Sequence, residues 1–395
     1  MLPQQETIRV IKSLLSHLDE GTTVDAGVQL KNPVSGYTSP EIAAREWQTF
    51  FLNYPHVLGL SSDLPEADCF ITSTDLGKPI LATRDSAGQF RAFLNVCRHR
   101  GTVVEDAERG QKRQFNCPFH AWGYNTQGEL ISVPKEDHFG KVDRSCHGLI
   151  ALPAEERWGL LWVHPDPDGI LDLETKLGGL ANELDSWDLE RYSYHGGTVF
   201  EHPMNWKLAI DTFGETYHFN TLHRNSLAQD FYGNVQTYDC YERNHRMMLC
   251  LKNIDTLRTQ KPQDWNVLLG ALPVYYLFPN VQLIIGLNGP TLIRVFPHQD
   301  NPHLSRSRIS FYLGEDAAKI QSSRMVDPTD IAQRMVEFAE VIRDEDYVVA
   351  ASAHIGAMSD AQDYVTFGRN EPALHHYHNT YREALGMPPL ESVEV

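Results

Sequence analysis

The sequence has few basic residues for its length, few cysteines and no long hydrophobic stretch. Its 395 residues contain 34 Lys and Arg against 52 Asp and Glu, which gives a formal net charge of −18. Such an acidic excess repels a phosphate backbone, and no run of Lys and Arg could form a local basic patch. We therefore expect no binding to nucleic acid.

The apolar runs are too short for a membrane protein. No stretch approaches the roughly 18 uninterrupted apolar residues of a spanning helix, and the first twenty residues lack the apolar core of a signal peptide. The six cysteines are too few and too scattered for a disulfide framework in a chain of this size. These absences predict a soluble, cytoplasmic protein in which an important cysteine is a metal ligand or a nucleophile.

Several signatures of enzyme chemistry are also missing. There is no G-x-G-x-x-G dinucleotide fingerprint and no C-x4-C-x2-C ferredoxin run, so we expect neither NAD(P)H binding nor a built-in reductase. No G-x-S-x-G elbow or H-E-x-x-H helix supports a hydrolase. Hydrophobic residues nevertheless make up 42% of the chain, which is typical of a globular protein, and the length favours two domains.

The secondary-structure pattern changes along the chain. Apolar residues at helical spacing predict an amphipathic helix near the N-terminus, and SPEIAAREWQTFF predicts a second helix with Ser39 as its N-cap. Short β-rich segments broken by turns then predict a compact all-β unit over 47–165. Beyond it, strands are mixed with helical stretches predicted at 204–218, 329–352 and 371–385. This second half is therefore predicted to be α+β.

Two short loops each combine a cysteine with a histidine. NVCRHRG supplies Cys97 and His99, and FNCPFHAWGY supplies Cys117 and His120. Two Cys and two His also suit a structural zinc site, but zinc fingers usually present a Cys pair followed by a His pair. A Rieske [2Fe–2S] cluster holds one iron with two cysteines and the other with two histidines, so each loop would supply one ligand to each iron. The pattern favours such a cluster, which transfers single electrons.

A second group of metal-binding residue types occurs in NWKLAIDTFGETYHFNTLHR, residues 205–224. His218 and His223 are five residues apart. On an ideal helix they would point about 140° from each other, so the helix must break between them if both bind one metal. Two imidazoles and one carboxylate, with open coordination positions, form the facial triad that prepares Fe(II) for O₂. For this segment taken alone, a pair of structural histidines is the alternative.

Together the motifs resemble those of the Rieske non-haem iron oxygenases, the terminal oxygenase (alpha) subunits of the aromatic-ring-hydroxylating and quaternary-amine oxygenase family. CRHRG followed by CPFHAWGY is similar to the paired cluster loops, and NWK followed by E-x-x-H-x4-H is similar to the catalytic-iron motif. VIRDEDYVVAASAHIG resembles the late helix that carries the third iron ligand, and the segment with GRNEP resembles the family's C-terminal segment. The resemblance covers roughly residues 45–385.

The resemblance implies a role for each matched residue. His218, His223 and Asp346 are expected to bind a mononuclear Fe(II). Glu345 is the next choice for the third ligand, although a neighbour in sequence is expected on another face of the helix. Glu215 is expected to be the acid that bridges the iron to the cluster. Most ring-hydroxylating members carry Asp at that position, whereas Glu resembles the branch that acts on carnitine and betaine.

The resemblance also implies an architecture and partners. We expect an α+β fold with an all-β Rieske domain at 47–165, inserted in an α+β catalytic domain of the helix-grip (START-like) type at 166–395. N-terminal helices at 1–46 are expected to pack on the catalytic domain. Electrons are expected from NAD(P)H through a separate reductase or ferredoxin. The cluster of one subunit is expected to serve the iron of its neighbour in a head-to-tail homotrimer, or in a trimer with a small second subunit.

The expected function is that of a terminal oxygenase, which uses O₂ to hydroxylate or dihydroxylate a small organic substrate, an aromatic compound in the first instance. Oxidative demethylation or C–N cleavage of a quaternary amine is the alternative within the family. A Rieske electron carrier without oxygenase activity and a zinc-stabilised binding module are the alternatives of another class. The 230 or so residues that follow the cluster domain carry a metal motif of their own and argue against the electron carrier.

Overall fold

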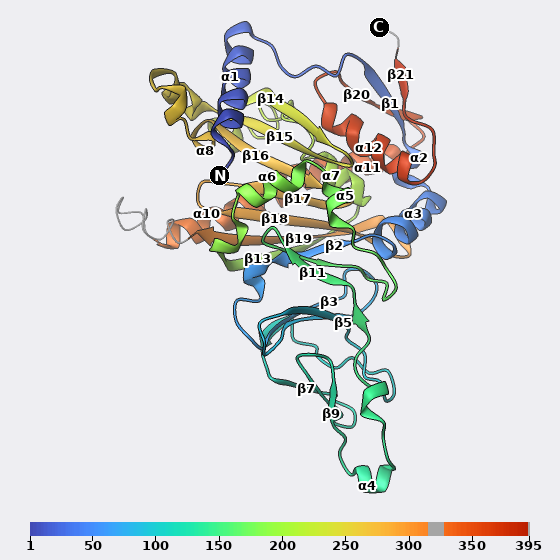
Figure 1. Ribbon diagram of the computed structural model, residues 1–395. Helices are drawn as coiled ribbons and strands as arrows, with labels where there is room; N and C mark the ends of the chain where they lie inside the picture. The colour runs from blue at the N-terminus through green and yellow to red at the C-terminus, as the bar shows by residue number, and fades with distance from the viewer. Residues whose placement is uncertain (315–327, 394–395) are drawn as a thin grey trace. The chain divides into compact units, whose positions relative to one another are not determined.

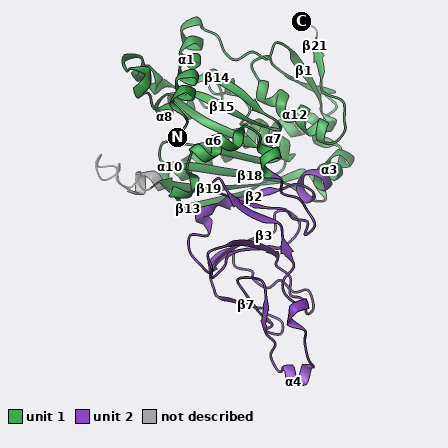
Figure 2. Ribbon diagram, in the orientation of Figure 1, with its two compact units in different colours: residues 1–47, 173–395 green, residues 48–172 purple. Residues whose placement is uncertain are grey.

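The computed structural model describes residues 1–314 and 328–393, with side chains described outside 328–332. The chain divides into two compact units, one made of residues 1–47 and 173–395 and the other of residues 48–172 (Figure 2). The smaller unit is therefore a continuous insertion between two segments of the larger one. Among the helices that the structure describes, none is long and apolar enough to cross a bilayer.

The smaller unit is built from short β-strands. They form a five-stranded sheet in the order β10-β5-β4-β3-β6 and two three-stranded sheets, β11-β12-β2 and β7-β8-β9. The strands are β2 (His56–Leu60), β3 (Cys69–Ser73), β4 (Ile80–Arg84), β5 (Phe90–Leu94), β6 (Arg109–Gln111), β7 (Gln114–Asn116), β8 (Gly123–Asn125), β9 (Leu130–Ser132), β10 (Ala151–Leu152), β11 (Ala154–Arg157) and β12 (Leu160–Val163). Its helical turns are Ser61–Asp63, α4 (Glu136–Phe139) and Arg144–Cys146.

The larger unit contains one antiparallel sheet of seven strands in the order β13-β19-β18-β17-β16-β15-β14 (Figure 1). The strands are β13 (Tyr192–His202), β14 (Phe231–Tyr241), β15 (Asn244–Leu251), β16 (Ala271–Leu277), β17 (Val281–Ile285), β18 (Pro290–His298) and β19 (Asn301–Gly314). A small sheet of β1 (Gln29–Pro33), β20 (Tyr364–Phe367) and β21 (Glu391–Val393) pairs the N-terminal segment with the last residues described. The predicted mixed α+β class is confirmed.

Helices complete the larger unit. The α-helices are α1 (Gln4–Glu20), α2 (Ser35–Thr38), α3 (Pro40–Glu46), α5 (Leu173–Leu177), α6 (Leu180–Ser186), α7 (Trp206–Asp211), α8 (Val267–Gly270), α10 (Pro328–Val341), α11 (Tyr347–Ala357) and α12 (Pro372–Ala384). A π-helical turn, Ile342–Asp346, joins α10 to α11, and another, Trp47–Leu52, follows α3. Short 3₁₀ turns cover Leu189–Arg191, Leu227–Gln229, Lys252–Thr259 and Pro262–Asp264.

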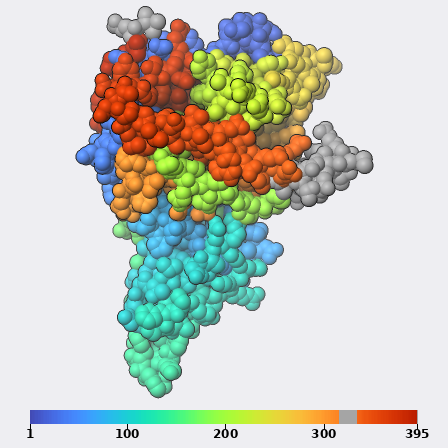
Figure 3. All heavy atoms as spheres, turned by 180° about the vertical axis from the view of Figure 1, so that it is seen from behind, coloured from blue at the N-terminus to red at the C-terminus, as the bar shows by residue number. Residues whose placement is uncertain are grey.

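Helices cover both faces of the seven-stranded sheet. Tyr275 and Tyr276 are consecutive on β16, so their side chains point to opposite faces. The Tyr275 hydroxyl accepts a 2.7 Å hydrogen bond from Trp187, which follows α6, whereas the Tyr276 hydroxyl lies 2.9 Å from the hydroxyl of Tyr381 on α12. Seen from behind, orange-red residues of the C-terminal third lie against yellow-green residues of the segment near 200–240 (Figure 3).

The stretch predicted as a helix over 204–218 forms a helix only over Trp206–Asp211. Asn205 caps its N-terminus by accepting a 3.0 Å hydrogen bond from the amide of Lys207. After the helix, Gly214 packs so closely that a Cβ there would lie 2.6 Å from Leu374 and 2.8 Å from Tyr377. Apolar spacing alone could not show this packing, which comes from α12, far away in the sequence.

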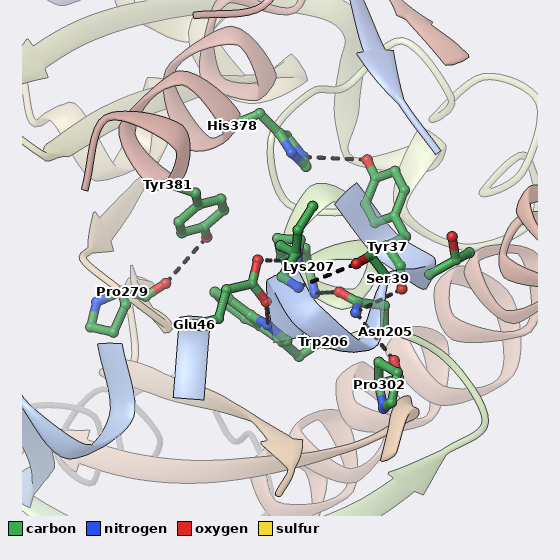
Figure 4. A network of polar contacts seen from close by, with 12 residues as sticks. Tyr37, Ser39, Glu46, Asn205, Trp206, Lys207, Pro279, Pro302, His378 and Tyr381 are labelled. Atoms are coloured by element: carbon green, nitrogen blue, oxygen red, sulfur yellow. Dashed lines mark hydrogen bonds and ion pairs between the residues drawn. The ribbon is translucent and has the colours of Figure 1, made fainter. Parts of the chain in front are cut away.

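A buried polar network holds the start of α7 in place (Figure 4). The Glu46 carboxylate, at the end of α3, accepts hydrogen bonds from the Lys207 ammonium and, at 3.0 Å, from the Trp206 indole. The Asn205 amide donates to the carbonyl oxygens of Tyr37 at 3.0 Å and of Pro302 at 3.1 Å. Four segments of the larger unit therefore fix the point at which the chain enters α7.

Replacing Lys207 with Met should destabilise the larger unit, because the buried Glu46 carboxylate loses its counter-charge. The two side chains are 3% and 2% exposed. We expect a loss of about 3–5 kcal/mol in the free energy of unfolding, measured by urea denaturation followed by circular dichroism. Arg369→Met is the matched control, because its pair with Asp25 is about half exposed, at 52% and 49%, and should contribute nothing measurable. Equal stability of the Lys207 variant and the wild type would contradict this account.

Candidate metal centres

The two cysteine–histidine loops of the smaller unit fold in the same way. The Cys97 amide donates to the Thr102 carbonyl at 2.8 Å, and the Gly101 amide donates to the Cys97 carbonyl at 3.0 Å. In the second loop, the Cys117 amide donates to the Trp122 carbonyl and the Ala121 amide donates to the Cys117 carbonyl, both at 2.9 Å. Gly101 and Ala121 occupy the same place in the two loops, and both have positive φ angles, 77° and 55°. Each loop is thus a tight turn closed around its cysteine.

The four predicted cluster ligands form two pairs. Cys97 and Cys117 are buried, each 3% exposed, whereas His99 is half-buried and His120 is exposed. The rings of His99 and His120 have centroids 4.7 Å apart. A thiol pair inside the fold and an imidazole pair at its surface fit the two irons of a Rieske cluster, in which the cysteines hold one iron and the histidines the other.

The surroundings of the thiols also fit a metal-bound state. Burial raises the pKa of the Cys117 thiol, the amides of Phe119 and His120 oppose this shift, and the neighbouring Cys97 thiol adds to it. The Tyr124 hydroxyl lies 3.3 Å from the Cys97 sulfur. The Cys117 thiol, whose pKa is raised, would become a thiolate when a metal binds, because the metal supplies the compensating charge. The loops can therefore hold an iron–sulfur cluster.

In the larger unit, His218 and His223 lie on a loop that follows α7. Residues 212–226 form a series of turns, in which Glu215 accepts hydrogen bonds from the amides of Tyr217 and His218. The turns remove the helical spacing that would hold the two imidazoles apart. Their Nε2 atoms are 3.1 Å apart as a result.

The Asp346 carboxylate completes this group. Its Oδ1 atom lies 3.2 Å from His223 Nε2 and 3.4 Å from His218 Nε2. Ligands about 2.1 Å from a metal and about 90° apart are separated by about 3.0 Å, so the three atoms suit one ion. We searched the described side chains, residues 1–314 and 333–393, for groups of three or more His, Cys, Asp or Glu that could hold a metal ion. The group found is His218, His223 and Asp346, whose ligand atoms all lie within 4.8 Å of one another.

Asp346 is the last residue of the π-helical turn Ile342–Asp346. The turn also brings Glu345 to the site, where its Oε2 atom lies 2.7 Å from His223 Nδ1. Glu345, the next choice for the third ligand, thus contacts the ring nitrogen of His223 opposite to the one that Asp346 faces. Two consecutive acids of one helical turn therefore meet different edges of the same imidazole.

A carboxylate contacts the Nδ1 atom of each imidazole. Glu215 accepts a hydrogen bond from His218 Nδ1, and Glu345 accepts one from His223 Nδ1. When Nδ1 carries the proton, the Nε2 lone pair is free for a metal. Both imidazoles thus present Nε2 to Asp346 and to each other.

The charges of the group support metal binding. Burial lowers the pKa of His218, but hydrogen bonds to Asp346 and Glu215 outweigh burial and raise it to about 9. In the same way, Asp346 and Glu345 outweigh burial and raise the pKa of His223. Burial raises the pKa of Asp346, whereas the two histidines hold it below its usual value. Imidazoles and carboxylates in contact thus favour each other's charged forms, and a divalent ion bound by the three ligand atoms would supply positive charge to the same acids.

An apolar cavity opens beside this group. Three of its lining residues, Glu215, His223 and Asp346, come from the metal group or its surroundings. The rest of the lining is Thr212, Phe213, Phe219, Leu227, Phe231, Leu249, Leu272, Val274, Ile284, Phe338 and Ile342. These side chains come from the loop after α7, from four strands of the sheet and from the helix that leads to Asp346. An apolar molecule held in this cavity would lie beside His223 and Asp346.

Sequence reasoning did not identify three residues of these sites. The Tyr124 hydroxyl bonds the Cys97 sulfur, although Tyr124 ends the conspicuous CPFHAWGY segment. Ser226 donates a 2.8 Å hydrogen bond to Glu345 and gives no signal in the sequence. Trp122 stacks on His99 with ring centroids 4.9 Å apart, and its aromatic side chain within the loop was the available signal.

Two family models match the chain. The model described as "Ring hydroxylating alpha subunit (catalytic domain)" matches residues 189–387, and the model described as "Rieske [2Fe-2S] domain" matches residues 55–148. The first covers half of the chain and contains the His218, His223 and Asp346 group. The second contains both cysteine–histidine loops.

Curated relatives come from both branches of the family. The oxygenase subunit of carnitine monooxygenase from Acinetobacter baumannii is 28% identical over 53% of this chain and 57% of that protein. The alpha subunit of biphenyl 2,3-dioxygenase from Rhodococcus jostii is 31% identical over 47% of this chain and 41% of that protein. The chain thus matches about half the length of these two relatives. Choline monooxygenase from Spinacia oleracea is 23% identical over 89% and 78%.

Solved structures share the fold. The quaternary ammonium Rieske monooxygenase CntA, in complex with an inhibitor, has a TM-score of 0.76 and 20% identity, over 91% of this chain and 96% of that chain. Naphthalene 1,2-dioxygenase with indole bound has a TM-score of 0.67 and 17% identity, over 92% and 93%. Because one family model covers half of the chain and the Rieske model matches a separate part, the chain belongs to the ring-hydroxylating alpha subunits, the Rieske non-haem iron oxygenases.

Proposed function

We propose that this chain is the terminal oxygenase of a multicomponent system, and that it uses O₂ to oxidise a small apolar substrate. The observation that carries the proposal is the group of His218, His223 and Asp346, whose ligand atoms lie within 4.8 Å of one another beside an apolar cavity. A Rieske electron carrier would need no such second centre. A zinc-stabilised binding module would need neither the cavity nor two separate metal motifs.

In this proposal each unit holds one metal centre. Cys97 and Cys117 hold one iron of the [2Fe–2S] cluster, and His99 and His120 hold the other. His218, His223 and Asp346 hold a mononuclear Fe(II) and leave positions open. The cluster supplies single electrons, and the mononuclear iron supplies O₂ binding and activation. The electrons come from NAD(P)H through a separate reductase or ferredoxin.

The larger unit would then be a helix-grip, START-like catalytic domain. Its support is the packing of the long helix α12 on one face of the antiparallel sheet. Tyr377 of α12 accepts a 2.8 Å hydrogen bond from Gln282 of β17, and Tyr381 contacts Tyr276 of β16. The helix backs the loop that carries His218, because Gly214 of that loop packs against Tyr377.

Glu215 is proposed as the bridge for electrons between two copies of the chain. One of its oxygens bonds His218 Nδ1, and the neighbouring Tyr217 is 65% exposed. On the cluster loops, His120 is exposed and Phe119 is 51% exposed. In a head-to-tail homotrimer, His120 of one copy would donate a hydrogen bond to Glu215 of the next. The exposed aromatic side chains at both centres would be buried by that contact.

The cavity favours a neutral, apolar substrate such as an aromatic hydrocarbon. Ten of its fourteen lining residues are Phe, Leu, Val or Ile, and none is Lys or Arg. Among the described residues that line the cavity, a buried carboxylate on the substrate would find no Lys or Arg to pair with, and it would face the carboxylates of Glu215 and Asp346. Aromatic acids and carnitine, which carry a carboxylate, are thus poor candidates.

A quaternary amine without a carboxylate is the second candidate. The observation in its favour is Glu215, which stands where most ring-hydroxylating members carry Asp. Four phenylalanines line the cavity, Phe213, Phe219, Phe231 and Phe338, and aromatic faces attract a trimethylammonium group. Demethylation or C–N cleavage would then replace ring hydroxylation.

A substrate comparison with a surrogate reductase tests the proposed function. We expect oxygen from ¹⁸O₂ to appear, by mass spectrometry, in products of a neutral bicyclic aromatic compound. Benzoate should react with a kcat/KM lower by about 100-fold or more, because its carboxylate would be buried unpaired. Release of an aldehyde or of trimethylamine from choline, with no product from the aromatic compound, would favour the second candidate instead.

Single replacements test the mononuclear site. His218→Ala, His223→Ala and Asp346→Ala should each lose the mononuclear iron and turnover, because two ligands do not hold Fe(II) in a facial site. The Rieske absorption should remain, which shows that the smaller unit is folded. Iron analysis should fall from three to two atoms per chain. Full activity of Asp346→Ala would contradict the ligand set.

Glu215→Gln tests the bridge. The amide keeps the size of the side chain but removes its charge, so both metal centres should remain. In a single turnover, with the cluster reduced beforehand, oxidation of the cluster by the iron site should slow by about 100-fold or more. Oxidation of substrate at the wild-type rate would contradict the bridge. Activity of a monomer, established by analytical ultracentrifugation, would contradict the trimer.

A further inference from the structure

His223 is bonded at both of its ring nitrogens, and the two bonds come from consecutive acids. Asp346 Oδ1 lies 3.2 Å from Nε2, and Glu345 Oε2 lies 2.7 Å from Nδ1. The His223 side chain is 1% exposed, so water does not compete for either nitrogen. The orientation of the ring therefore depends on these two carboxylates.

A third contact holds the Glu345 carboxylate. Ser226 Oγ donates a 2.8 Å hydrogen bond to the same Oε2 atom that contacts His223. The Ser226 amide donates to the His223 carbonyl at 2.9 Å, so Ser226 is itself tied to the loop that it serves. The arrangement is a closed ring of contacts that joins the loop after α7 to the π-helical turn.

We infer that Glu345 is the positioning residue of His223, held in place by Ser226, and this inference rests on the proposed function, in which His223 Nε2 binds the iron. By accepting a hydrogen bond from Nδ1–H, Glu345 selects the tautomer whose Nε2 lone pair faces Asp346 and His218. The negative charge also makes the imidazole a stronger ligand. Glu345 is not a ligand itself, because it contacts Nδ1 of His223, whereas Asp346 and His218 face Nε2 on the other edge of the ring.

Glu345 and Glu215 make the same contact to different histidines but differ in their surroundings. Glu215 lines the cavity, and its carboxylate also accepts from the backbone amides of Tyr217 and His218. Glu345 is absent from the cavity lining, and its other partner is Ser226. Loss of Glu345 should therefore weaken metal binding without interrupting electron transfer to iron that is bound.

The test measures the Fe(II) affinity of the full chain with its Rieske cluster intact, under anaerobic conditions and by competition with a chromogenic chelator. Glu345→Ala should weaken Fe(II) binding by about 10- to 100-fold, the usual cost of losing such an outer carboxylate. Glu345→Gln keeps an acceptor oxygen and should restore part of the affinity. The cluster absorption should stay close to wild type, because the cluster loops belong to the smaller unit.

Asp344→Ala is the matched control. Asp344 is the neighbouring acid, its side chain is 57% exposed, and it pairs with Arg343 at 2.6 Å rather than with the site. Its removal should leave the Fe(II) affinity unchanged. Ser226→Ala is the second variant if Glu345→Ala fails to fold, and it should weaken Fe(II) binding by less than about tenfold, since the carboxylate remains.

Two results would overturn the inference. Wild-type Fe(II) affinity in both Glu345→Ala and Ser226→Ala would show that the ring needs no support. Complete loss of Fe(II) from Glu345→Ala even at saturation, with retention in Asp346→Ala, would make Glu345 the ligand. The Fe(II) affinity measurement does not depend on turnover. If the wild-type chain and all variants lacked turnover, that result would therefore count against the proposed function and not against this inference.

Discussion

The metal site of the larger unit depends on contacts between carboxylates and imidazoles that join two distant segments. His223 and Asp346 are 123 residues apart in sequence, and their nearest ring and carboxylate atoms are 3.2 Å apart. Three acids, Glu215, Glu345 and Asp346, contact the two histidines of the site. Their carboxylates would repel one another unless positive charge neutralised them. The two histidines hold the pKa of Asp346 below its usual value, and a divalent ion bound at the ligand atoms would supply the same compensating charge. The same contacts thus hold the fold and prepare the site.

The rest of the larger unit fixes where these segments meet. The buried pair of Glu46 and Lys207 sets the start of α7, and the packing of Gly214 against α12 sets the path of the chain after it. The segment between Lys207 and Gly214 is short, so the loop that carries His218 and His223 has little conformational freedom at its N-terminal end. The π-helical turn before α11 supplies the complementary half of the site. Rigid elements on both sides therefore keep the ligand atoms in place.

Much of the fold was predictable because its signals are local. Ser39 caps α3 as expected, its hydroxyl accepting a 3.3 Å hydrogen bond from the Ile42 amide, since capping involves only neighbouring residues. The β-rich texture of the smaller unit follows from turn residues and short apolar runs. The early end of α7 and the π-helical turn at Ile342–Asp346 were not predictable, because they depend on packing against α12 and on contacts with the loop after α7. Propensity and apolar spacing do not report such contacts.

The sequence by itself determined the candidate ligand types and their grouping. One cysteine and one histidine lie in each cluster loop, and a histidine pair five residues apart follows an acid, because each set is held within a single short segment. Only the tertiary structure decided which acid of the late helix faces the Nε2 atoms, that Glu345 contacts the opposite edge of His223, and that a cavity adjoins them whose described lining residues include no Lys or Arg. The physical reason is that these features arise where segments more than 100 residues apart pack together, and a side chain's spacing along its own helix does not specify what it meets across that interface.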